Sequence, residues 1–398
     1  MAAHAATDRA VTGGDSMDHS AMDRAVAAAL EGVRGANPLV GAVLTGPDGR
    51  VLSVGRHRGA DTPHAESDAL AAWARLREQD ADASAIDPSA CTLHVTLEPC
   101  DHTGRTGPCS AAVRNAGIGR LVYAVADPTG TSGGGAATLR SAGVEVLGPT
   151  GHPGAVALTE RWRRARAAGR PFVTAHLAQS LDGCAAAADG TSRWITSPQS
   201  RAHAHTVRGR VDAIVVGTGT VLADDPRLTV RHDGGSLADD PRLTVRHDGG
   251  SLADAQPVPV VMGHRDVPAA AALRRHPALA AGQEPMHVRS HDPADVLEAI
   301  AHRPGPWPHG RGGCEHLLVE GGPTVLAAWI AADLVDELHV YTAPTFLGPG
   351  LSAVAGLGVA TLADAVRWAP DRAEGGPVRP FGPDTWTHLQ PATAAGKE

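Results

Sequence analysis

Three potential metal ligands constrain the fold of this chain more than any other feature. They are His64, which lies two residues before Glu66, and the cysteines Cys100 and Cys109. One imidazole and two thiolates suit a tetrahedral zinc ion whose fourth position stays open for water. Glu66 is too close to His64 in the sequence to be a convenient fourth ligand, but it is placed to transfer the proton of that water. The sequence therefore predicts one zinc ion per chain, held by His64, Cys100 and Cys109.

This order of residues is typical of zinc deaminases, in which activated water attacks an amino-bearing ring carbon and the glutamate acts as acid and base. The general signature, H-x-E followed by P-C-x-x-C, has two residues between its cysteines, whereas this chain has eight. A structural zinc site is the alternative, and His57, His94 or His102 could supply its fourth ligand. The position of Glu66 and the proline before the first cysteine have no role in a structural site, so we favour a catalytic one.

The composition excludes several classes of protein. Lys397 is the only lysine, and its place beside the C-terminus excludes a Schiff-base mechanism. The net charge is −8 and no basic stripe with interleaved aromatics is present, so we expect no nucleic-acid partner. Five widely spaced cysteines favour a reducing compartment over a disulfide framework. No signal peptide and no apolar run of membrane-spanning length is present, so we expect a cytoplasmic protein with no membrane partner.

Strand-like and helix-like segments alternate in the first part of the chain, which predicts a three-layer α/β domain over residues 17–153. Residues 1–16 are expected to form a disordered tail, and Met17, where the first helical pattern begins, could be the true start. Strands are expected at residues 39–45, 50–56, 91–97, 121–126 and 143–147, and helices from 17, at 62–78 and at 108–116. Both ligand groups would then lie at helix N-termini, where exposed N–H dipoles favour thiolate over thiol.

An arginine-rich helix is expected to link this domain, over residues 154–170, to a second α/β domain over residues 171–398. Strands of the second domain are expected at residues 173–178, 213–216, 257–262, 317–320 and 337–342. Helices are expected to begin at 197, at 292 or 293, and at 323. Ser197 is a plausible N-cap just ahead of Pro198.

A tandem duplication of fifteen residues occupies residues 223–252, where 223–237 is followed at once by an identical copy, 238–252. Two copies are too few for a solenoid, which needs at least three repeats to bury a continuous core. We interpret the duplication as a loop insertion, since the entropic cost of closing a loop grows slowly with its length.

A series of ordered motifs resembles the bifunctional riboflavin-biosynthesis deaminase–reductase family, and the resemblance runs from about Met17 to the C-terminus. The long spacing between the cysteines is the spacing that this family shows. The motifs of the N-terminal half are Asn37-Pro38-Leu39-Val40-Gly41, Gly55-Arg56-His57, Pro63-His64-Ala65-Glu66, Thr96-Leu97-Glu98-Pro99-Cys100 and Gly104-Arg105-Thr106-Gly107-Pro108-Cys109. Those of the C-terminal half are Ser180-Leu181-Asp182-Gly183, Arg193-Trp194-Ile195-Thr196-Ser197, Thr220-Val221-Leu222-Ala223-Asp224-Asp225-Pro226 and Glu320-Gly321-Gly322-Pro323-Thr324.

The resemblance implies a cytidine-deaminase-like N-terminal domain and a dihydrofolate-reductase-like C-terminal domain. It implies zinc-dependent deamination of 2,5-diamino-6-(5-phosphoribosylamino)pyrimidin-4(3H)-one, followed by NADPH reduction of the ribosyl group to ribityl. It also implies a small-molecule substrate and a homodimer or higher homo-oligomer formed through the reductase domain.

Site residues follow from the same resemblance. In the deaminase, Glu66 would transfer the proton and Asn37, His57, His102 and Arg105 would bind substrate. In the reductase, the substrate-binding positions are Ser192, Arg208, Leu228, Arg231 and Glu320. The cofactor-binding positions are Ala178, Trp194, Thr220, Asp224, Gly263, Gly322, Pro323 and Thr324. A glycine turn at a helix start suits the NADPH phosphates, and two arginines suit a substrate phosphate.

Three positions depart from the family pattern. His176 stands where the family usually has lysine, which shortens the reach and makes the charge pH-dependent. Thr129 replaces an asparagine, and Asp101 replaces a serine near the expected phosphate end. In the second loop copy, Asp239, Leu243 and Arg246 could compete with Asp224, Leu228 and Arg231 for the same roles, although we favour the first copy. These departures leave open a second hypothesis, a paralogous pyrimidine deaminase with a degenerate, non-reducing C-terminal domain.

Overall fold

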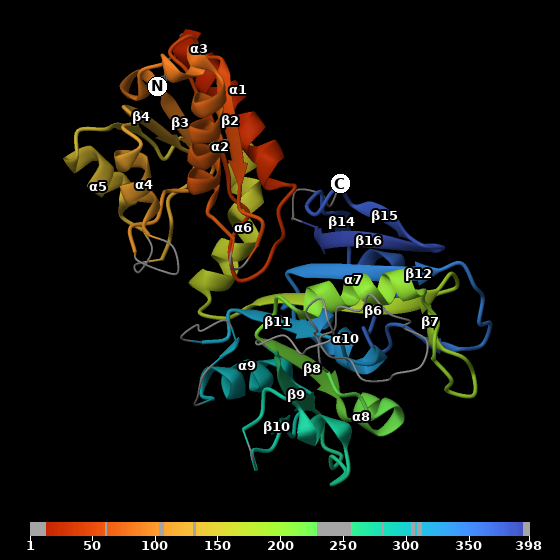
Figure 1. The fold of residues 1–398 in the computed structure, drawn as a ribbon. Coiled ribbons are helices and arrows are strands. Elements are labelled where there is room, and N and C mark those ends of the chain that lie inside the picture. The colour runs from red at the N-terminus through yellow and green to blue at the C-terminus, as the bar shows by residue number, and fades with distance from the viewer. Residues whose placement is uncertain are drawn as a thin grey trace, which may run out of the picture. The chain divides into compact units, whose positions relative to one another are not determined.

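The computed structural model describes residues 13–59, 62–102, 107–129, 133–228, 256–280, 282–303, 307–308 and 313–392. The chain forms two compact units, Met1–Arg163 and Arg164–Glu398, and the boundary falls inside helix α6 (Pro153–Ala167). Among the described residues, no helix is both long and apolar enough to cross a membrane. Figure 1 shows the elements of each unit along the chain.

A five-stranded sheet with the order β2-β1-β3-β4-β5 forms the centre of the first unit. Strand β1 (Gly41–Thr45) pairs antiparallel with β2 (Val51–Arg56) and with β3 (Thr92–Val95). Strands β3, β4 (Arg120–Tyr123) and β5 (Glu145–Leu147) are parallel. All five strands correspond to the segments expected from the alternating pattern.

Helices cover both faces of this sheet. A Cβ on Gly41 would lie 1.9 Å from the Ala25 oxygen of α1, and one on Gly55 would lie 2.2 Å from the Ala65 oxygen of α2. Gly55 pairs with Ala42, the neighbour of Gly41, so the two helices lie on opposite faces. Only glycine allows so close an approach. The helices are α1 (Gly13–Ala29), α2 (Ala65–Gln79), α3 (Ala81–Ser84), α4 (Cys109–Asn115), α5 (Gly135–Ser141) and α6.

Helix α1 corrects one expectation. Residues 13–16, assigned to a disordered tail from their small and polar composition, are helical. Propensity alone does not favour a helix in this glycine-containing stretch. The rest of α1 buries Met22 and Ala25 in the core, and this tertiary packing supports the helix as a whole.

A mixed sheet of nine strands forms the centre of the second unit, with the order β10-β9-β8-β11-β6-β12-β16-β14 and β15 paired with β16. The strands from β10 to β12 are parallel, and those from β16 onward are antiparallel. The strands are β6 (Phe172–Ser180), β8 (Ala213–Gly217), β9 (Val258–Met262), β10 (Met286–Val288), β11 (His316–Val319), β12 (Glu337–Ala343), β14 (Trp368–Pro370), β15 (Val378–Phe381) and β16 (Asp384–Pro391). A separate two-stranded sheet pairs β7 (Cys184–Ala186) with β13 (Leu351–Ser352).

Two hydrophobic clusters lie on the two faces of this sheet. Successive side chains of β8 point to opposite faces, so Ile214 belongs to one cluster and Val215 to the other. Helix α7 (Pro198–Arg208) and helix α8 (Thr218–Asp224) contribute to the first cluster. Helix α9 (Pro293–Ala301) and helix α10 (Pro323–Ala331) contribute to the second. The predicted cap of α7 is confirmed, since the Ser197 side chain accepts a hydrogen bond from the Ser200 amide and Pro198 occupies the first turn.

Asp384 at the start of β16 fastens this cap to the sheet. Its Oδ2 accepts hydrogen bonds from the Ser197 amide and the Ser200 hydroxyl, each 2.6 Å away, and the residue is 2% exposed. We expect Asp384→Ala to lower the free energy of unfolding by about 2–4 kcal/mol, because two buried donors lose a charged acceptor. Denaturant titration measures this loss. The exposed Asp295→Ala is the control, with an expected change below about 0.5 kcal/mol; equal effects of the two variants would contradict the prediction.

Candidate active sites

The three predicted metal ligands meet at the ends of elements in the first unit. His64 is the N-cap of α2, Cys109 is the first residue of α4, and Cys100 lies in the loop between β3 and α4. His64 Nδ1 lies 3.5 Å from Cys100 Sγ and 3.3 Å from Cys109 Sγ. A tetrahedral zinc with ordinary bond lengths separates nitrogen and sulfur ligands by about 3.6 Å. The donor set and its spacing therefore fit zinc.

Electrostatics at the two thiols also suit a cation. The hydrogen bond from the Cys109 side chain lowers the pKa of Cys100 to about 4, against the effect of burial. The same interaction and burial raise the pKa of Cys109, so one thiol carries the proton that the other has lost. The Cys109 amide donates to Cys100 Sγ at 3.4 Å and further favours the thiolate. A bound dication would draw both sulfurs into the thiolate form, since metal ligands must be deprotonated.

Glu66 lies in the first turn of α2 and is only 3% exposed. Burial raises the pKa of its carboxyl, although the neighbouring His64 lowers it in part. A raised pKa brings a carboxylate closer to the range in which it both accepts and returns a proton. Among the described residues, the ligand group contains His64, Cys100 and Cys109 alone, so it leaves the fourth position open.

The predicted substrate residues of the deaminase are partly brought together. Asn37 Nδ2 lies 3.0 Å from His57 Nε2, and the His57 and His64 rings meet edge to face at 5.5 Å. His57 is buried beside the metal ligands, while His102 is exposed in the loop after Cys100. Arg105 lies outside the described residues.

Two of the departures from the family pattern have local partners. The Asp101 carboxylate accepts hydrogen bonds from the Ser110 and Thr138 hydroxyls, which lower its pKa. Thr129 donates through its amide and its hydroxyl to Asp127, at 2.8 and 2.6 Å. Both residues therefore stabilise their own loops. The two hydroxyls stabilise the ionised form of the Asp101 carboxylate.

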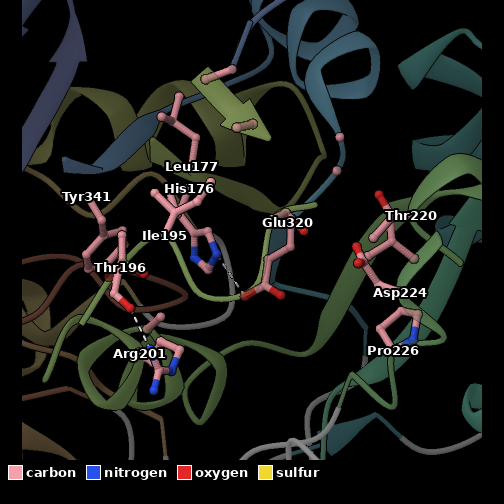
Figure 2. A pocket seen from close by; sticks show the side chains of 18 of the residues that line it. His176, Leu177, Ile195, Thr196, Arg201, Thr220, Asp224, Pro226, Glu320 and Tyr341 are labelled. Carbon is pink, nitrogen blue, oxygen red and sulfur yellow. Dashed lines mark hydrogen bonds and ion pairs between the residues drawn. The ribbon is translucent and has the colours of Figure 1, made fainter. Parts of the chain in front are cut away.

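A cavity of about 300 Å³ opens in the second unit, around the carboxyl ends of β6 and β11. Glu320, which follows β11, lies at its centre and makes a bidentate pair with Arg208 of α7, at 2.6 and 2.5 Å. His176 Nε2 lies 3.2 Å from the same carboxylate (Figure 2). Burial opposes ionisation of Glu320, but Arg208 and His176 together outweigh it and lower the pKa of the carboxyl.

His176 differs from its sequence-based expectation. Burial lowers its pKa to about 4, although Glu320 opposes this effect. The imidazole is therefore neutral near neutral pH, and the expected pH dependence of its charge falls at acidic pH. The environment of strand β6, hidden from a sequence, decides the protonation state.

A second cavity, of about 740 Å³, adjoins the first and shares Thr220, Asp224 and Glu320 with it. Backbone from two glycine-containing turns lines it, at residues 217–219 and 321–322. Thr324 lies near the start of α10, where free amides favour a phosphate. A long cavity that ends at a helix N-terminus, next to a smaller one, suits a long phosphorylated cofactor beside a compact substrate.

The structure places most of the predicted reductase residues around these cavities. The smaller cavity is lined by Ser192, Arg208, Leu228 and Glu320, and also by Ala178 and Trp194. Both cavities are lined by Thr220, Asp224, Gly322 and Pro323, and the larger one also by Thr324. Gly263 lines neither cavity, whereas its neighbours Met262 and His264 line the larger one.

Two residues of the first loop copy, Asp224 and Leu228, line the smaller cavity. The Leu228 side chain is only 1% exposed and also belongs to a hydrophobic cluster of the core. Arg231 of this copy lies outside the described residues, and so do Asp239, Leu243 and Arg246 of the second copy.

Some lining residues were not predicted from the sequence. Figure 2 shows Tyr341 of β12 and Arg201 of α7 in the wall of the smaller cavity. The Tyr341 hydroxyl lies 2.9 Å from His203 Nδ1, and the Arg201 guanidinium lies over the Trp194 ring at 4.5 Å. Arg201 lies one helical turn after Ser197, the predicted helix start. That prediction placed Arg201 on a helix but did not indicate that it lines a cavity. Nothing in the sequence around Tyr341 distinguishes it from a core aromatic.

The fold and the two sites define a bifunctional α/β enzyme that combines a zinc deaminase unit with a dinucleotide-dependent reductase unit. The model of the cytidine and deoxycytidylate deaminase zinc-binding region matches residues 15–125, and that of the RibD C-terminal domain matches residues 171–374. The riboflavin biosynthesis protein RibD of Mycobacterium tuberculosis is 38% identical over 87% of this chain and 90% of its own length. The corresponding protein of Corynebacterium ammoniagenes is 36% identical over 87% and 91%. The chain belongs to the RibD family of riboflavin-pathway deaminase–reductases.

Solved structures agree with this assignment. RibD of Acinetobacter baumannii is 28% identical, with a TM-score of 0.65, and covers 95% of this chain and 99% of its own. A diaminohydroxyphosphoribosylaminopyrimidine deaminase/5-amino-6-(5-phosphoribosylamino)uracil reductase from Thermotoga maritima is 26% identical, with a TM-score of 0.64 and the same coverage. The predicted family, fold class and bifunctional activity are confirmed, and zinc and NADPH are the cofactors. A paralogue with a non-reducing C-terminal domain is not favoured, because the relatives match both halves.

Proposed function

We propose that the two units act in succession on one pyrimidine ribosyl phosphate. The first would convert the diaminopyrimidinone to its deaminated form with release of ammonia, and the second would reduce the ribosylamino group to ribitylamino. The activity by which the Thermotoga maritima relative is named supports this substrate. The convergence of His64, Cys100 and Cys109 beside the buried Glu66 is the observation that carries the proposal. The domain limits proposed are residues 17–153 and 171–398, joined over 154–170.

Zinc, when bound, would polarise a water molecule and help it lose a proton. Glu66 would accept this proton as the water oxygen bonds to the ring carbon, and would return it to the amino group as the carbon–nitrogen bond breaks. Ammonia then leaves, and oxygen takes its place on the ring. Asn37 and His57, joined at 3.0 Å beside the metal ligands, would orient the pyrimidine. His102 and Arg105 would bind the phosphate end.

In the second unit, NADPH would supply a hydride to C1′ of the ribose. We assign the larger cavity to the cofactor, because glycine backbone and the start of α10 favour its phosphates. The smaller cavity would hold the substrate, with Arg208 and Glu320 fixed to each other at its centre. Both groups would orient the ribose hydroxyls.

A coupled assay with the phosphorylated diaminopyrimidine tests the proposed function. Without NADPH, the product mass should show replacement of one amino group by oxygen, and ammonia should appear in equal amount. With NADPH, the mass should rise by two hydrogens. Ammonia release with no further mass change would restrict the function to deamination.

Gly321→Ala should weaken NADPH binding without affecting deamination. An added Cβ would lie 2.4 Å from Cγ1 and 2.5 Å from Cβ of Val325, which is fixed to the α10 backbone, so the turn must move. We expect the KM for NADPH to rise at least about 10-fold, since small displacements of a binding element carry large kinetic penalties. Gly313→Ala is the matched control, because no neighbour lies within 4 Å of its added Cβ. An unchanged KM in Gly321→Ala would remove the turn from the cofactor site.

We also propose a cytoplasmic homodimer or higher homo-oligomer formed through the reductase domain. All five cysteines are free, which is consistent with a reducing compartment.

Phe346, Leu351 and Leu362 of the second unit are 72%, 55% and 81% exposed, and large exposed apolar side chains favour association. Light scattering during gel filtration measures the assembly, and a monomer at micromolar concentration would contradict the proposal.

A further inference from the structure

A second group of metal-type ligands lies in the first unit, away from the three residues of the catalytic site. His19 and Asp23 are one helical turn apart on α1, and His152 immediately precedes α6. His152 Nε2 lies 3.2 Å from Asp23 Oδ1, and His19 Nε2 lies 3.8 Å from Asp23 Oδ2. The three ligand atoms lie within 4.8 Å of one another, and the two imidazole rings are 4.5 Å apart.

These separations are those of ligands that share one ion. Nitrogen and oxygen ligands of a tetrahedral zinc, bound at ordinary lengths, are separated by about 3.3 Å. The two measured distances, 3.2 and 3.8 Å, lie on either side of this value. The side chains of His19 and Asp23 are 62% and 63% exposed, so an ion reaches them directly from solvent and retains a water ligand.

His152 provides an independent observation. Its side chain is only 6% exposed, its Nε2 has the Asp23 carboxylate as partner at 3.2 Å, and its Nδ1 has no hydrogen-bond partner among the described residues. A metal ion could take the place of the proton between Nε2 and the Asp23 carboxylate, so that both groups would ligate the same cation.

We propose that His19, Asp23 and His152 bind a second divalent transition-metal ion of the zinc class, with water in the fourth position. The ligands are two imidazoles and a carboxylate, with no sulfur, so the site would accept zinc, cobalt or nickel. The ion would join α1 to the start of α6. These helices already meet where Val26 lies 3.4 Å from the position of an added Cβ on Gly154. The ion would therefore stabilise the deaminase unit from outside its catalytic site.

Another group, made up of Glu337, His339 and His388 in the second unit, has a different character. Glu337 Oε1 lies 2.6 Å from His388 Nε2, which is a hydrogen bond, and Oε2 accepts a second one from Thr174 at 2.7 Å. All three side chains are at most 1% exposed. Their carboxylate is satisfied by protein donors, and the group is closed to solvent.

Zinc stoichiometry tests the proposal on the full chain. Protein freed of metal by a chelator and then equilibrated with zinc in a weakly competing buffer should hold two zinc ions per chain, measured by mass spectrometry of the metal. His19→Ala and Asp23→Ala should each hold one. His302→Ala, which removes an exposed histidine from the second unit, should hold two. Retention of two ions by both His19→Ala and Asp23→Ala, or a single ion in the unmodified chain, would overturn the proposal.

A variant of the catalytic site separates this inference from the proposed function. Cys100→Ser should lose the catalytic zinc and still hold one ion, and added zinc should raise its Tm. The same rise should be missing when Asp23→Ala is combined with Cys100→Ser. Cobalt gives a second readout, because only the cysteine site produces thiolate charge-transfer absorption. The Cys100→Ser variant should therefore bind cobalt with ligand-field bands alone, and failure to bind cobalt would count against the outer site.

Discussion

Glu66→Gln should reduce ammonia release by about 10²–10⁴-fold, the range that general acid–base catalysis supplies. Glutamine preserves the shape of a side chain that is 3% exposed, but it cannot accept the proton of the attacking water. The three ligands are untouched, so zinc should stay at the level of the unmodified chain. Reduction of the already deaminated substrate by NADPH should also continue, because the second unit contains its own cavities.

The measurement combines steady-state ammonia release, metal analysis and NADPH oxidation on the same preparations. Glu78→Gln, an exposed glutamate on the same helix, is the matched control and should keep full activity. Full turnover in Glu66→Gln with zinc present would remove this residue from the reaction. Loss of zinc together with activity would assign it a structural role instead.

The Arg208–Glu320 pair gives the second large effect. Removing one partner of a buried ion pair costs about 3–5 kcal/mol, because the remaining charge is left unpaired in the interior. Arg208→Met or Glu320→Gln should therefore destabilise the second unit and stop NADPH oxidation, while ammonia release continues. Glu284→Gln, which breaks an exposed pair with Arg274, is the control and should change stability by less than about 1 kcal/mol.

A double variant separates stability from function at this pair. Arg208→Met combined with Glu320→Gln removes both charges of the pair, so neither is left unpaired and much of the lost stability should return. Reductase activity should stay lost, because the polar groups that orient the ribose are both absent. Recovery of NADPH oxidation in the double variant would show that the pair is structural only.

The alternation of strands and helices predicted the parallel strands of each sheet, with the exception of the short β10. In the second unit, β8, β9 and β11 are buried along their whole length and are rich in valine, isoleucine and leucine, although β9 also contains Pro259. This pattern is visible in the sequence without tertiary information. The antiparallel strands β14, β15 and β16 were not predicted. β14 and β15 are short and contain proline, and both pair with β16, so they become strands only when that partner is present.

The two sites also differ in how far the sequence predicted them. The metal ligands were predictable, because zinc restricts both the donor types and their surroundings to a few combinations. The reductase site depends on an interaction between Arg208 and Glu320, which are far apart in the sequence and meet because α7 packs over the end of β11. The protonation of His176 depends on the same packing, since burial shifts its pKa more strongly than any neighbour in the chain.

By itself, then, the sequence determined which atoms are available for metal chemistry and where most of the parallel strands and their helices lie, because ligand preference and backbone periodicity are local properties. Only the tertiary structure decided which charges face each other, which imidazole stays neutral and which side chains share a cavity wall. Those outcomes depend on desolvation and on distances between segments, and the folded chain alone sets both.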